Sequence, residues 1–367
     1  MSSHRSFLLY PFALVYRLVT DFRNFLYNTG ILPSHEFAVP VISVGNLTVG
    51  GTGKTPHTEY LAGLLQKQFG VAILSRGYKR NSKGFRIVTA ASTAGEAGDE
   101  PLQTARKYPG VIVAVDRSRK NGIRKIMQQF PETEVILLDD AFQHRQITPG
   151  LSILLSNCGR LMTRDHMLPY GNLREKISNM RRADVIIITK SPLGMLPMQK
   201  RLIVKEIAKA PYQHLFFTTV RYGTPQPLGS GSTLPPPDFS APDRTGILLV
   251  TGIANPDPLK EFIQTLASEV IHLKYPDHCR FREKDIAAMG ESFKRLVSPA
   301  KYIITTEKDA VRLGGLAGIT DITNSPYPPV YYIPIDIDFL YDSKNDFNKL
   351  ITDYVRKNKR DNRISEI

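Results

Sequence analysis

The chain has 367 residues, 42% of them hydrophobic and 22% charged, which excludes a mostly disordered chain and a polytopic membrane protein and suggests two domains. The formal net charge of +14 favours an anionic partner such as nucleic acid, acidic lipid or a phosphorylated substrate. With only two cysteines, Cys158 and Cys279, the chain lacks a disulfide framework, and we expect a reducing compartment.

Residues 6–27 are the first predicted element, an aromatic-rich amphipathic helix. Pro11, Arg17, Asp21 and Arg23 interrupt its apolar run, so it falls short of the about 20 mostly apolar residues that a membrane span needs. No small-residue cleavage site follows it, which argues against a signal peptide. Such a helix either lies in a bilayer interface or packs onto the body of the protein. The residues at helical spacing are Phe7, Tyr10, Leu14, Leu18, Phe22 and Phe25.

Short β-rich runs alternate with helical stretches from residue 39 onward. Near-continuous Val/Ile/Leu runs of this kind are typical of parallel strands that are buried on both faces. Their alternation with helices, the first over 55–68, predicts βαβ units and a doubly wound, mainly parallel α/β sheet. The predicted strands are 39–45, 71–75, 111–115, 135–138, 151–155 and 184–189.

A second, smaller α/β domain follows a segment rich in Pro, Gly and Ser, which is typical of a linker or a long surface loop. Its predicted strands begin in the runs 246–257, 269–275, 301–306 and 330–336, and the last 17 residues are expected to form a basic, partly frayed end. The predicted division is an N-terminal membrane-associating helix (1–30), a P-loop domain (31–222), a linker (223–245) and a smaller C-terminal domain (246–367).

The strongest motif is SVGNLTVGGTGKTP, residues 43–56, which lies between a predicted strand and a predicted helix. This context is the one that a P-loop requires. Its glycines let backbone N–H groups turn towards a phosphate, and the helix directs its positive N-terminus to the same place. Lys54 would reach the β- and γ-phosphates, and the Thr55 hydroxyl would ligate Mg²⁺. The predicted nucleotide-binding residues are Thr48, Gly50, Gly51, Thr52, Gly53, Lys54 and Thr55.

One position departs from the standard P-loop pattern. G-x-x-x-x-G-K-S/T needs glycine at position 48, where this chain has Thr48, so the loop is a variant. His57 falls in the first turn of the following helix, and we predict that it is a surface or packing residue rather than a catalytic one.

Two acidic sites accompany the loop. In EVILLDDAFQHR, residues 134–145, an apolar strand ends at Asp139 and Asp140, where P-loop folds place the carboxylate that holds Mg²⁺. Adjacent residues of an extended segment point to opposite sides, so we expect the two to divide roles. In GDEP, residues 98–101, the residues alone favour a helix start with Asp99 as N-cap and Pro101 in the first turn.

Nine sequence blocks occur in a fixed order along the chain: SVGNLTVGGTGKTP, LSRGYKR (74–80), GDEP, LLDDAFQH (137–144), GNLRE (171–175), ITKSP (188–192), TGIANP (251–256), PDH (276–278) and TTEKDAVRL (305–313). Taken together, these blocks resemble the tetraacyldisaccharide 4′-kinase family. The resemblance runs from about residue 5 to beyond residue 313, and one block departs from it: the family usually has glycine where this chain has Ala141. Glycine adopts positive φ more readily than alanine.

The resemblance implies transfer of phosphate from ATP, with Mg²⁺, to the 4′-hydroxyl of tetraacyldisaccharide 1-phosphate, giving lipid IV-A in lipid A biosynthesis. This substrate is a glycolipid of the membrane, so the N-terminal helix is expected to act as an interfacial anchor and the basic surface to meet anionic lipid. The implied location is the cytoplasmic face of the Gram-negative inner membrane, as a peripheral or monotopic enzyme. Neither nucleic acid nor an obligate protein partner is expected.

The resemblance also implies a catalytic pair, Asp99 and His278, in which the carboxylate takes the proton of the sugar hydroxyl and the imidazole orients that carboxylate. Lys54 and Mg²⁺ are expected to contribute more to the rate than this pair does, and domain closure on ATP is expected. Glu175 would lie near Mg²⁺ or the nucleotide. Contacts to the disaccharide or its phosphate are implied for Arg76, Tyr78, Arg117 and Arg119.

Two other functions compete with this one. A P-loop GTPase or metal-chaperone ATPase is suggested by ITKSP, which is similar to a guanine-reading element, but Pro192 stands where that element needs Asp. A nucleic-acid-binding P-loop protein is suggested only by the net charge, without an aromatic and basic stacking motif. A metal site at Cys279 beside His278 lacks the ligand spacing of zinc sites.

Overall fold

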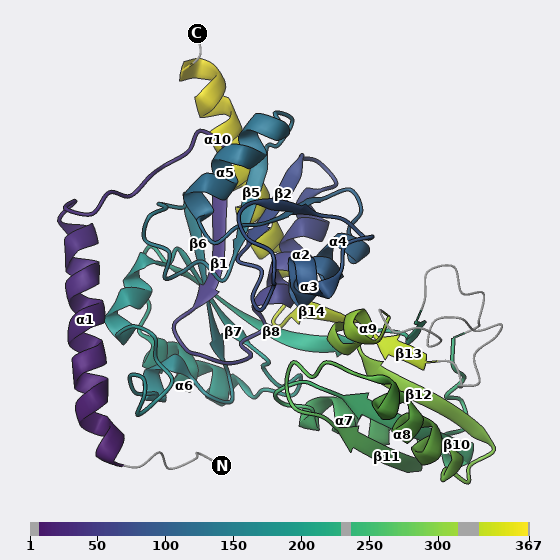
Figure 1. The fold of residues 1–367 in the computed structure, drawn as a ribbon. Coiled ribbons are helices and arrows are strands. Elements are labelled where there is room, and N and C mark those ends of the chain that lie inside the picture. The colour runs from purple at the N-terminus through teal and green to yellow at the C-terminus, as the bar shows by residue number, and fades with distance from the viewer. Residues whose placement is uncertain (1–6, 229–235, 315–329, 366–367) are drawn as a thin grey trace. The chain divides into compact units, whose positions relative to one another are not determined.

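The computed structural model describes residues 7–228, 236–314 and 330–365, with side chains of the last helix as far as Asn358. It divides the chain into two compact units (Figure 1). Unit 1 comprises Met1–Ala90, Thr104–Val220 and Ile337–Ile367, and unit 2 comprises Ala91–Gln103 and Arg221–Asp336.

The larger sheet has nine strands in the order β14-β8-β7-β6-β1-β5-β2-β4-β3. Strand β1 lies near its middle, parallel to both β5 and β6, and each of its residues is buried. The strands are β1 (Val41–Asn46), β2 (Val71–Ser75), β3 (Arg86–Val88), β4 (Ile112–Val115), β5 (Val135–Asp139), β6 (Leu151–Asn157), β7 (Val185–Thr189), β8 (His214–Tyr222) and β14 (Ile335–Phe339).

Helices cover both faces of this sheet. The connections β1–α2–β2 and β4–α5–β5 run in opposite directions across it, so right-handed crossovers place α2 and α5 on opposite faces. This arrangement confirms the predicted doubly wound, mainly parallel sheet. The helices are α2 (Lys54–Leu65), α4 (Asp99–Lys107), α5 (Arg119–Gln129), α6 (Pro197–Ile207) and α10 (Lys344–Ser365), with 3₁₀ turns at Phe7–Leu9, Met162–Arg164 and Ile177–Arg182. The short helix α3 (Ala94–Ala97) and the 3₁₀ turn Pro242–Arg244 belong to unit 2.

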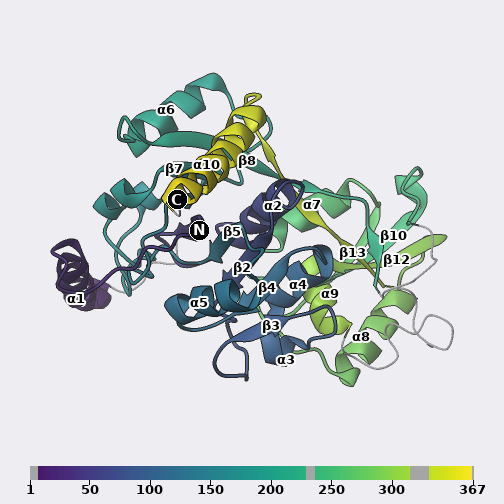
Figure 2. The same ribbon diagram turned by 90° about the horizontal axis from the view of Figure 1, so that it is seen from above.

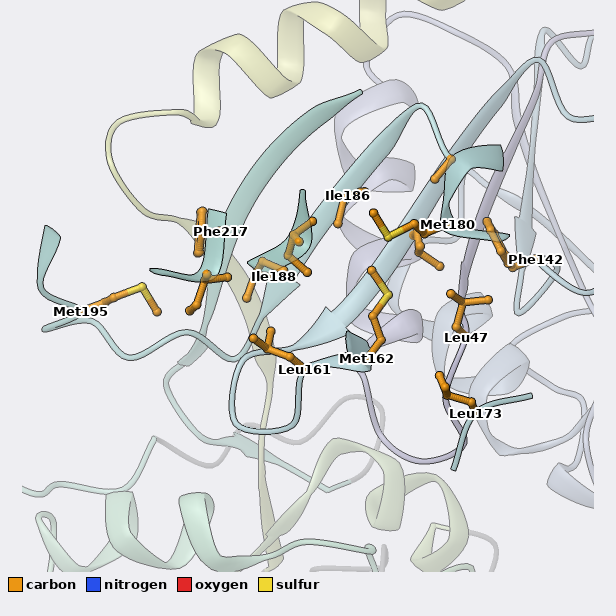
Figure 3. Packing of buried hydrophobic residues seen from close by; sticks show 14 residues of the cluster. Leu47, Phe142, Leu161, Met162, Leu173, Met180, Ile186, Ile188, Met195 and Phe217 are labelled. Carbon is orange, nitrogen blue, oxygen red and sulfur yellow. The ribbon is translucent and has the colours of Figure 1, made fainter. Parts of the chain in front are cut away.

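One core cluster of unit 1 lies beneath β6 and β7. Ile186 and Ile188 of β7 pack with Ile203 of α6 and with Phe217 of β8. Figure 3 shows this cluster spread along the sheet, from Met195 and Phe217 to Leu47 and Leu173. Leu47 opens the loop between β1 and α2, so the packing of this core supports the segment that follows β1.

Unit 2 is a smaller α/β unit with a five-stranded sheet in the order β11-β10-β12-β13-β9. Strand β10 is parallel to β11 and β12, and the short β9 is antiparallel to β13. Its elements are β9 (Gln226–Pro227), β10 (Thr245–Thr251), α7 (Asp257–Gln264), β11 (Glu269–Lys274), α8 (Glu283–Lys294), β12 (Ala300–Thr306), α9 (Glu307–Leu313) and β13 (Val330–Ile333).

The C-terminal segment differs from its prediction. The run 330–336 forms two strands, β13 and the start of β14, separated at Pro334. After it, α10 is an ordered helix as far as Ser365 and belongs to unit 1 rather than to the smaller unit, as does everything from Ile337. Helix α10 packs onto unit 1 because it has an apolar face: the ring of Phe347 on that face lies 5.2 Å from the ring of Phe216 in β8.

Other boundaries also differ. Residues 91–103 belong to unit 2, although the predicted P-loop domain included them. Strands β3, β8 and β9 had no predicted counterpart, and β9 lies inside the predicted linker. Residues 229–235 of that linker lie outside the described residues.

Helix α10 lies beside α2 (Figure 2), where the Tyr60 hydroxyl donates to Asn348 at 2.7 Å.

Helix α1 (Tyr10–Asn28) forms the predicted N-terminal element and turns its apolar face away from unit 1. Ala13, Thr20 and Asn24, small or polar residues, are the buried ones. The aromatic and aliphatic side chains are outside, at Phe7, Leu8, Tyr10, Phe12, Leu14, Val15, Leu18, Val19, Phe22 and Phe25. Among the described residues, no helix has both the length and the apolarity to cross a bilayer.

Candidate active site

The phosphate loop, residues 47–53, connects β1 to α2. Gly50 and Gly53 have φ angles of 106° and 87°, which side chains with a Cβ rarely adopt. Asn46 donates to the Thr52 hydroxyl at 2.8 Å, and the Thr189 hydroxyl donates to the Thr52 carbonyl at 2.8 Å. The loop is therefore held from β1 and β7, while the first N–H groups of α2 have no acceptors within their own helix.

Thr48, the departure from the standard pattern, is buried and pairs with the neighbouring segment. It forms an antiparallel bridge with Leu173, and the Val49 N–H donates to the Asn172 carbonyl at 2.8 Å. Its φ is not in the left-handed region. Glycine is therefore not needed at this position, and the variant loop has no strain there.

Lys54 is the first residue of α2 and faces an acidic side chain. Its Nζ lies 3.6 Å from Asp140 Oδ1, and Arg174 Nη1 donates to the same oxygen at 3.0 Å. Burial alone would raise the pKa of Asp140, but Lys54 and Arg174 outweigh it and hold the pKa below its usual value. The site therefore has an ionised carboxylate between two cations.

Asp139 and Asp140 are directed to different partners. Asp139 ends β5 and accepts from the Thr58 hydroxyl of α2 at 3.4 Å, whereas Asp140 has a φ of 48° and turns towards Lys54. The neighbouring Ala141 does not have positive φ. The strained residue is Asp140, so the alanine that replaces the usual glycine needs no unfavourable backbone conformation.

His57 is a buried packing residue. Its Nδ1 lies 2.7 Å from the Gly53 carbonyl and its Nε2 lies 2.9 Å from the Thr218 hydroxyl. Burial lowers the pKa of His57 to about 4, so the imidazole is neutral at pH 7. It ties the start of α2 to β8.

The basic residues predicted to meet the substrate occupy different environments. Arg76, Tyr78 and Arg117 are exposed. Arg119 is only 2% exposed, and its guanidinium donates to the Asp116 and Asp139 carbonyls. Burial lowers the pKa of Arg119 to about 10, and in this structure the side chain supports the end of β5.

His144 is a residue of this region that sequence reasoning did not single out. Burial, then the charges of Arg119 and Arg76, lowers its pKa to about 4. His144, Arg119 and Arg76 are thus near enough to interact electrostatically. The negative charge of Asp140 acts against the two arginines and raises the pKa of His144. The sequence signal that could have identified His144 is its place in the block LLDDAFQH, four residues after Asp140.

Glu175 was predicted to lie near Mg²⁺ or the nucleotide, which stays a prediction; in the structure it is buried among other side chains. The residue is 0% exposed, and both oxygens are occupied: Oε1 accepts from Arg23 and Oε2 from Asn24, Asn179 and Arg182. Its neighbour Arg174 donates to Asp140, so adjacent side chains of this segment serve different partners. Glu175 therefore links α1 to the segment 175–182 of the same unit.

A second constellation, the Asp99 cluster, lies within unit 2 and consists of Asp99, His278, Lys308, Asp309 and Arg312. Asp99 begins α4 but its carboxylate faces His278, with Oδ2 3.3 Å from Nδ1. His278 has a φ of 61°, and such strain is often found at functional sites. The chain thus brings together the two residues that the resemblance pairs.

The donor set near the phosphate loop fits a Mg²⁺ ion that is shared with a nucleotide. Such a site uses one or two carboxylates together with phosphate oxygens rather than an all-protein cage. Thr55, Asp139 and Asp140 offer oxygen donors of this kind, and within the described ranges no group of three or more His, Cys, Asp or Glu residues has the arrangement of a metal site.

The strand–loop–helix with its lysine and the acidic end of the adjacent strand define a P-loop nucleotide-binding protein of the α/β class. The family model described as tetraacyldisaccharide-1-P 4′-kinase matches residues 5–356. The chain belongs to this kinase family, which confirms the resemblance drawn from the motifs and leaves the GTPase and nucleic-acid alternatives without support.

Relatives and a solved structure agree with this assignment. The tetraacyldisaccharide 4′-kinase of Bacteroides thetaiotaomicron is 44% identical, covering 98% of this chain and 95% of that protein. The Flavobacterium johnsoniae enzyme of the same name is 40% identical, covering 96% and 97%. The crystal structure of LpxK from Aquifex aeolicus in complex with ATP is 30% identical, with a TM-score of 0.71 over 95% of this chain and 98% of that one.

Proposed function

We propose that this chain transfers the γ-phosphate of ATP to the 4′-hydroxyl of tetraacyldisaccharide 1-phosphate in lipid A biosynthesis, giving lipid IV-A. The observation that carries the proposal is the Lys54–Asp140–Arg174 arrangement behind the phosphate loop. It combines with family membership over nearly the whole chain. The ATP complex of the Aquifex aeolicus relative supports ATP as the donor.

The phosphate loop would bind the nucleotide through its backbone N–H groups. Loose phosphoryl transfer depends mainly on positioning and charge neutralisation, and Lys54 supplies a cation at the helix start for the β- and γ-phosphates. Mg²⁺ would be held by Thr55 and the acidic end of β5, and it supplies neutralisation of phosphate charge. Arg174 keeps Asp140 ionised and oriented.

Asp99 would act as the general base. A sugar hydroxyl is a weak nucleophile at neutral pH, and a carboxylate within hydrogen-bond reach contributes about 10²–10⁴-fold by taking its proton. His278, at 3.3 Å from Asp99 Oδ2, would orient that carboxylate. Arg76, Tyr78 and Arg117 are the exposed candidates for contact with the disaccharide or its phosphate.

The membrane proposal rests on the orientation of α1. Its exposed apolar side chains, from Phe7 to Phe25, are an interfacial surface of the kind that enters the headgroup region of a bilayer. Beside it lies a cavity of about 350 Å³ whose lining includes Arg17, Lys176 and Asp165 next to the apolar Met167 and Ile177. Cations next to apolar groups suit an anionic lipid surface, so we infer a peripheral enzyme on the cytoplasmic face of the inner membrane.

The test is transfer of labelled γ-phosphate from ATP to tetraacyldisaccharide 1-phosphate in mixed micelles. Wild type should form the phosphorylated lipid only with Mg²⁺. We expect Lys54→Ala to lower kcat by about 10³-fold or more, and Asp99→Ala and His278→Ala to lower it by about 10²-fold or more. Lys349→Ala, an exposed change in the same unit as Lys54, is the matched control.

Each outcome separates one part of the proposal from another. Full activity of Asp99→Ala and His278→Ala would keep the kinase and remove the proposed base. A folded wild type that binds ATP and leaves the lipid unphosphorylated would contradict the function itself. Binding to anionic vesicles that survives Phe22→Asp together with Leu18→Asp would contradict the role of α1.

A further inference from the structure

Arg312, which no part of the proposed mechanism uses, is 5% exposed and lies between two carboxylates of unit 2. Thr306 caps α9 and exchanges two hydrogen bonds with Asp309, the third helical residue. Three residues further on, Arg312 reaches back, as i,i+3 neighbours on a helix do. Its Nη1 donates to Asp309 Oδ1 at 2.7 Å and to the Gly252 carbonyl at 3.0 Å.

The rest of the guanidinium is directed at Asp99. Nε and Nη2 of Arg312 donate to Asp99 Oδ2 at 2.9 and 2.7 Å. An arginine that pairs with a carboxylate commonly spreads its fork over both oxygens, but here both bonds end on one oxygen. Every hydrogen bond that the structure gives to the Asp99 carboxylate ends on Oδ2.

His278 adds a third donor to the same oxygen. Its Nδ1 lies 3.3 Å from Asp99 Oδ2 and 3.1 Å from Arg312 Nη2, and a ring nitrogen cannot both donate to the first and accept from the second. Lys308 decides between them: its Nζ lies 3.4 Å from His278 Nε2. An ammonium only donates, and the Asp277 carboxylate is farther from Nε2, at 3.9 Å. We therefore assign Nε2 as the acceptor and the ring proton to Nδ1, facing Asp99.

We propose that Arg312 is a positioning residue that occupies Oδ2 of Asp99 and leaves Oδ1 as the oxygen that takes the proton of the acceptor hydroxyl. A carboxylate oxygen has two lone pairs, so the three donors on Oδ2, two from Arg312 and one from His278, leave no lone pair of that oxygen for the acceptor hydroxyl. The inference deepens the proposed function, because it rests on Asp99 as general base.

Proton transfer to Asp99 accompanies phosphoryl transfer. The O–H bond of the acceptor hydroxyl breaks and its proton moves to Asp99 Oδ1, while the acceptor oxygen forms a bond to the γ-phosphorus of ATP. The bond between that phosphorus and the β–γ bridging oxygen breaks, and its electron pair stays on ADP. Displacing a base by about 1 Å can cost about 10²-fold in rate, which sets the size of the effect expected for Arg312.

The first test is Arg312→Lys, which keeps the charge and removes the fork. We expect kcat to fall about 10- to 100-fold, with KM for ATP changed by less than about twofold. In an Asp99→Ala background the same change should have little further effect, because the two residues act as one unit. Lys294→Met removes an exposed cation of the same unit and should leave kcat unchanged.

A purely structural role for Arg312 has a different signature. Arg312→Met leaves Asp309, which is 0% exposed, without its cation and is expected to lower Tm. Adding Asp309→Asn removes that unpaired charge and should restore Tm. We expect kcat of the double variant to remain at least about 10-fold below wild type, and recovery of kcat together with Tm would overturn the inference.

The ring proton of His278 gives a readout that does not depend on turnover. In ¹⁵N spectra of the full chain near neutral pH, we expect a protonated Nδ1 and a bare Nε2 in wild type. A bare Nδ1 would overturn the three-donor arrangement on Oδ2. Wild type that fails to phosphorylate the lipid while His278 has the expected tautomer would overturn the proposed function and leave the hydrogen-bond assignment standing.

Discussion

The phosphate-loop region of unit 1 and the Asp99 cluster of unit 2 use charge in opposite ways. Around the phosphate loop, Lys54 and Arg174 converge on Asp140, which is 36% exposed. In the Asp99 cluster, the cation Arg312 is itself buried and has carboxylates on two sides, one of them the fully buried Asp309. The first region is an open group of cations with one carboxylate, and the second is a closed hydrogen-bonded set around one arginine.

This difference teaches how the two regions divide the chemistry. Cations at a partly open site are available to neutralise an incoming polyphosphate. A carboxylate whose second oxygen is saturated by fixed donors is suited to accept a proton in one defined direction. We therefore expect the removal of a charged side chain near the phosphate loop to lower activity more than the removal of a positioning hydrogen bond in either unit.

The largest effect is expected for Asp140→Asn. Without this carboxylate, Lys54 and Arg174 repel each other and lose their common partner, so we expect kcat to fall about 10³-fold.

Asp139→Asn should instead raise the Mg²⁺ concentration needed for half-maximal rate, because Asp139 ends β5 facing α2. Steady-state rates across a Mg²⁺ titration measure both, with exposed Asp353→Asn as control. Equal Mg²⁺ dependence in all three would contradict the division of roles.

Glu175→Gln tests the fastening of α1. It removes a buried charge that Arg23 and Arg182 share, and breaking a buried ion pair from one side costs about 3 kcal/mol. We expect a lower urea midpoint and faster proteolysis between α1 and β1. The control is Glu132→Gln, at an exposed position. If the midpoint and the cleavage rate both match wild type, Glu175 does not hold α1 in place.

The pH dependence of stability tests the packing of His57 in unit 1. In the folded chain its pKa is lowered from 6.5 to about 4, so between those values the unfolded chain binds more protons. Stability is therefore complete above pH 6.5 and decreases as pH falls towards 4, by about 3 kcal/mol at most. His57→Gln should flatten this part of the stability profile in urea titrations. A profile as steep as that of wild type would assign the loss to other groups.

The smallest effects compare one helix cap in each unit. Thr306→Ala and Ser118→Ala each remove an N-cap acceptor, at about 1 kcal/mol of stability. Thr306 also holds Asp309, the partner of Arg312, so only Thr306→Ala should lower kcat, by a few-fold. Calorimetry and steady-state kinetics on both variants provide the comparison. An equal loss of kcat from Ser118→Ala would remove the distinction.

The sequence predicted the phosphate loop and its surroundings well because the determinants are local. A buried strand, three glycines and a lysine at a helix start lie within one short stretch, and the strand-end acids follow from the same pattern. Most strands of both sheets were predicted from their Val/Ile/Leu runs. Strand β8 was missed because its residues, His214–Tyr222, mix polar and aromatic side chains without a clear period.

By itself, the sequence determined the α/β class, the strand–loop–helix that binds phosphate, the amphipathic nature of α1 and, through its ordered motifs, the kinase family. Tertiary structure alone decided that α10 returns to unit 1, that Glu175 holds α1, and that Arg312 meets Asp99. The physical reason is distance along the chain: Arg312 and Asp99 are 213 residues apart, and no local pattern of spacing specifies which buried charge will lie opposite which.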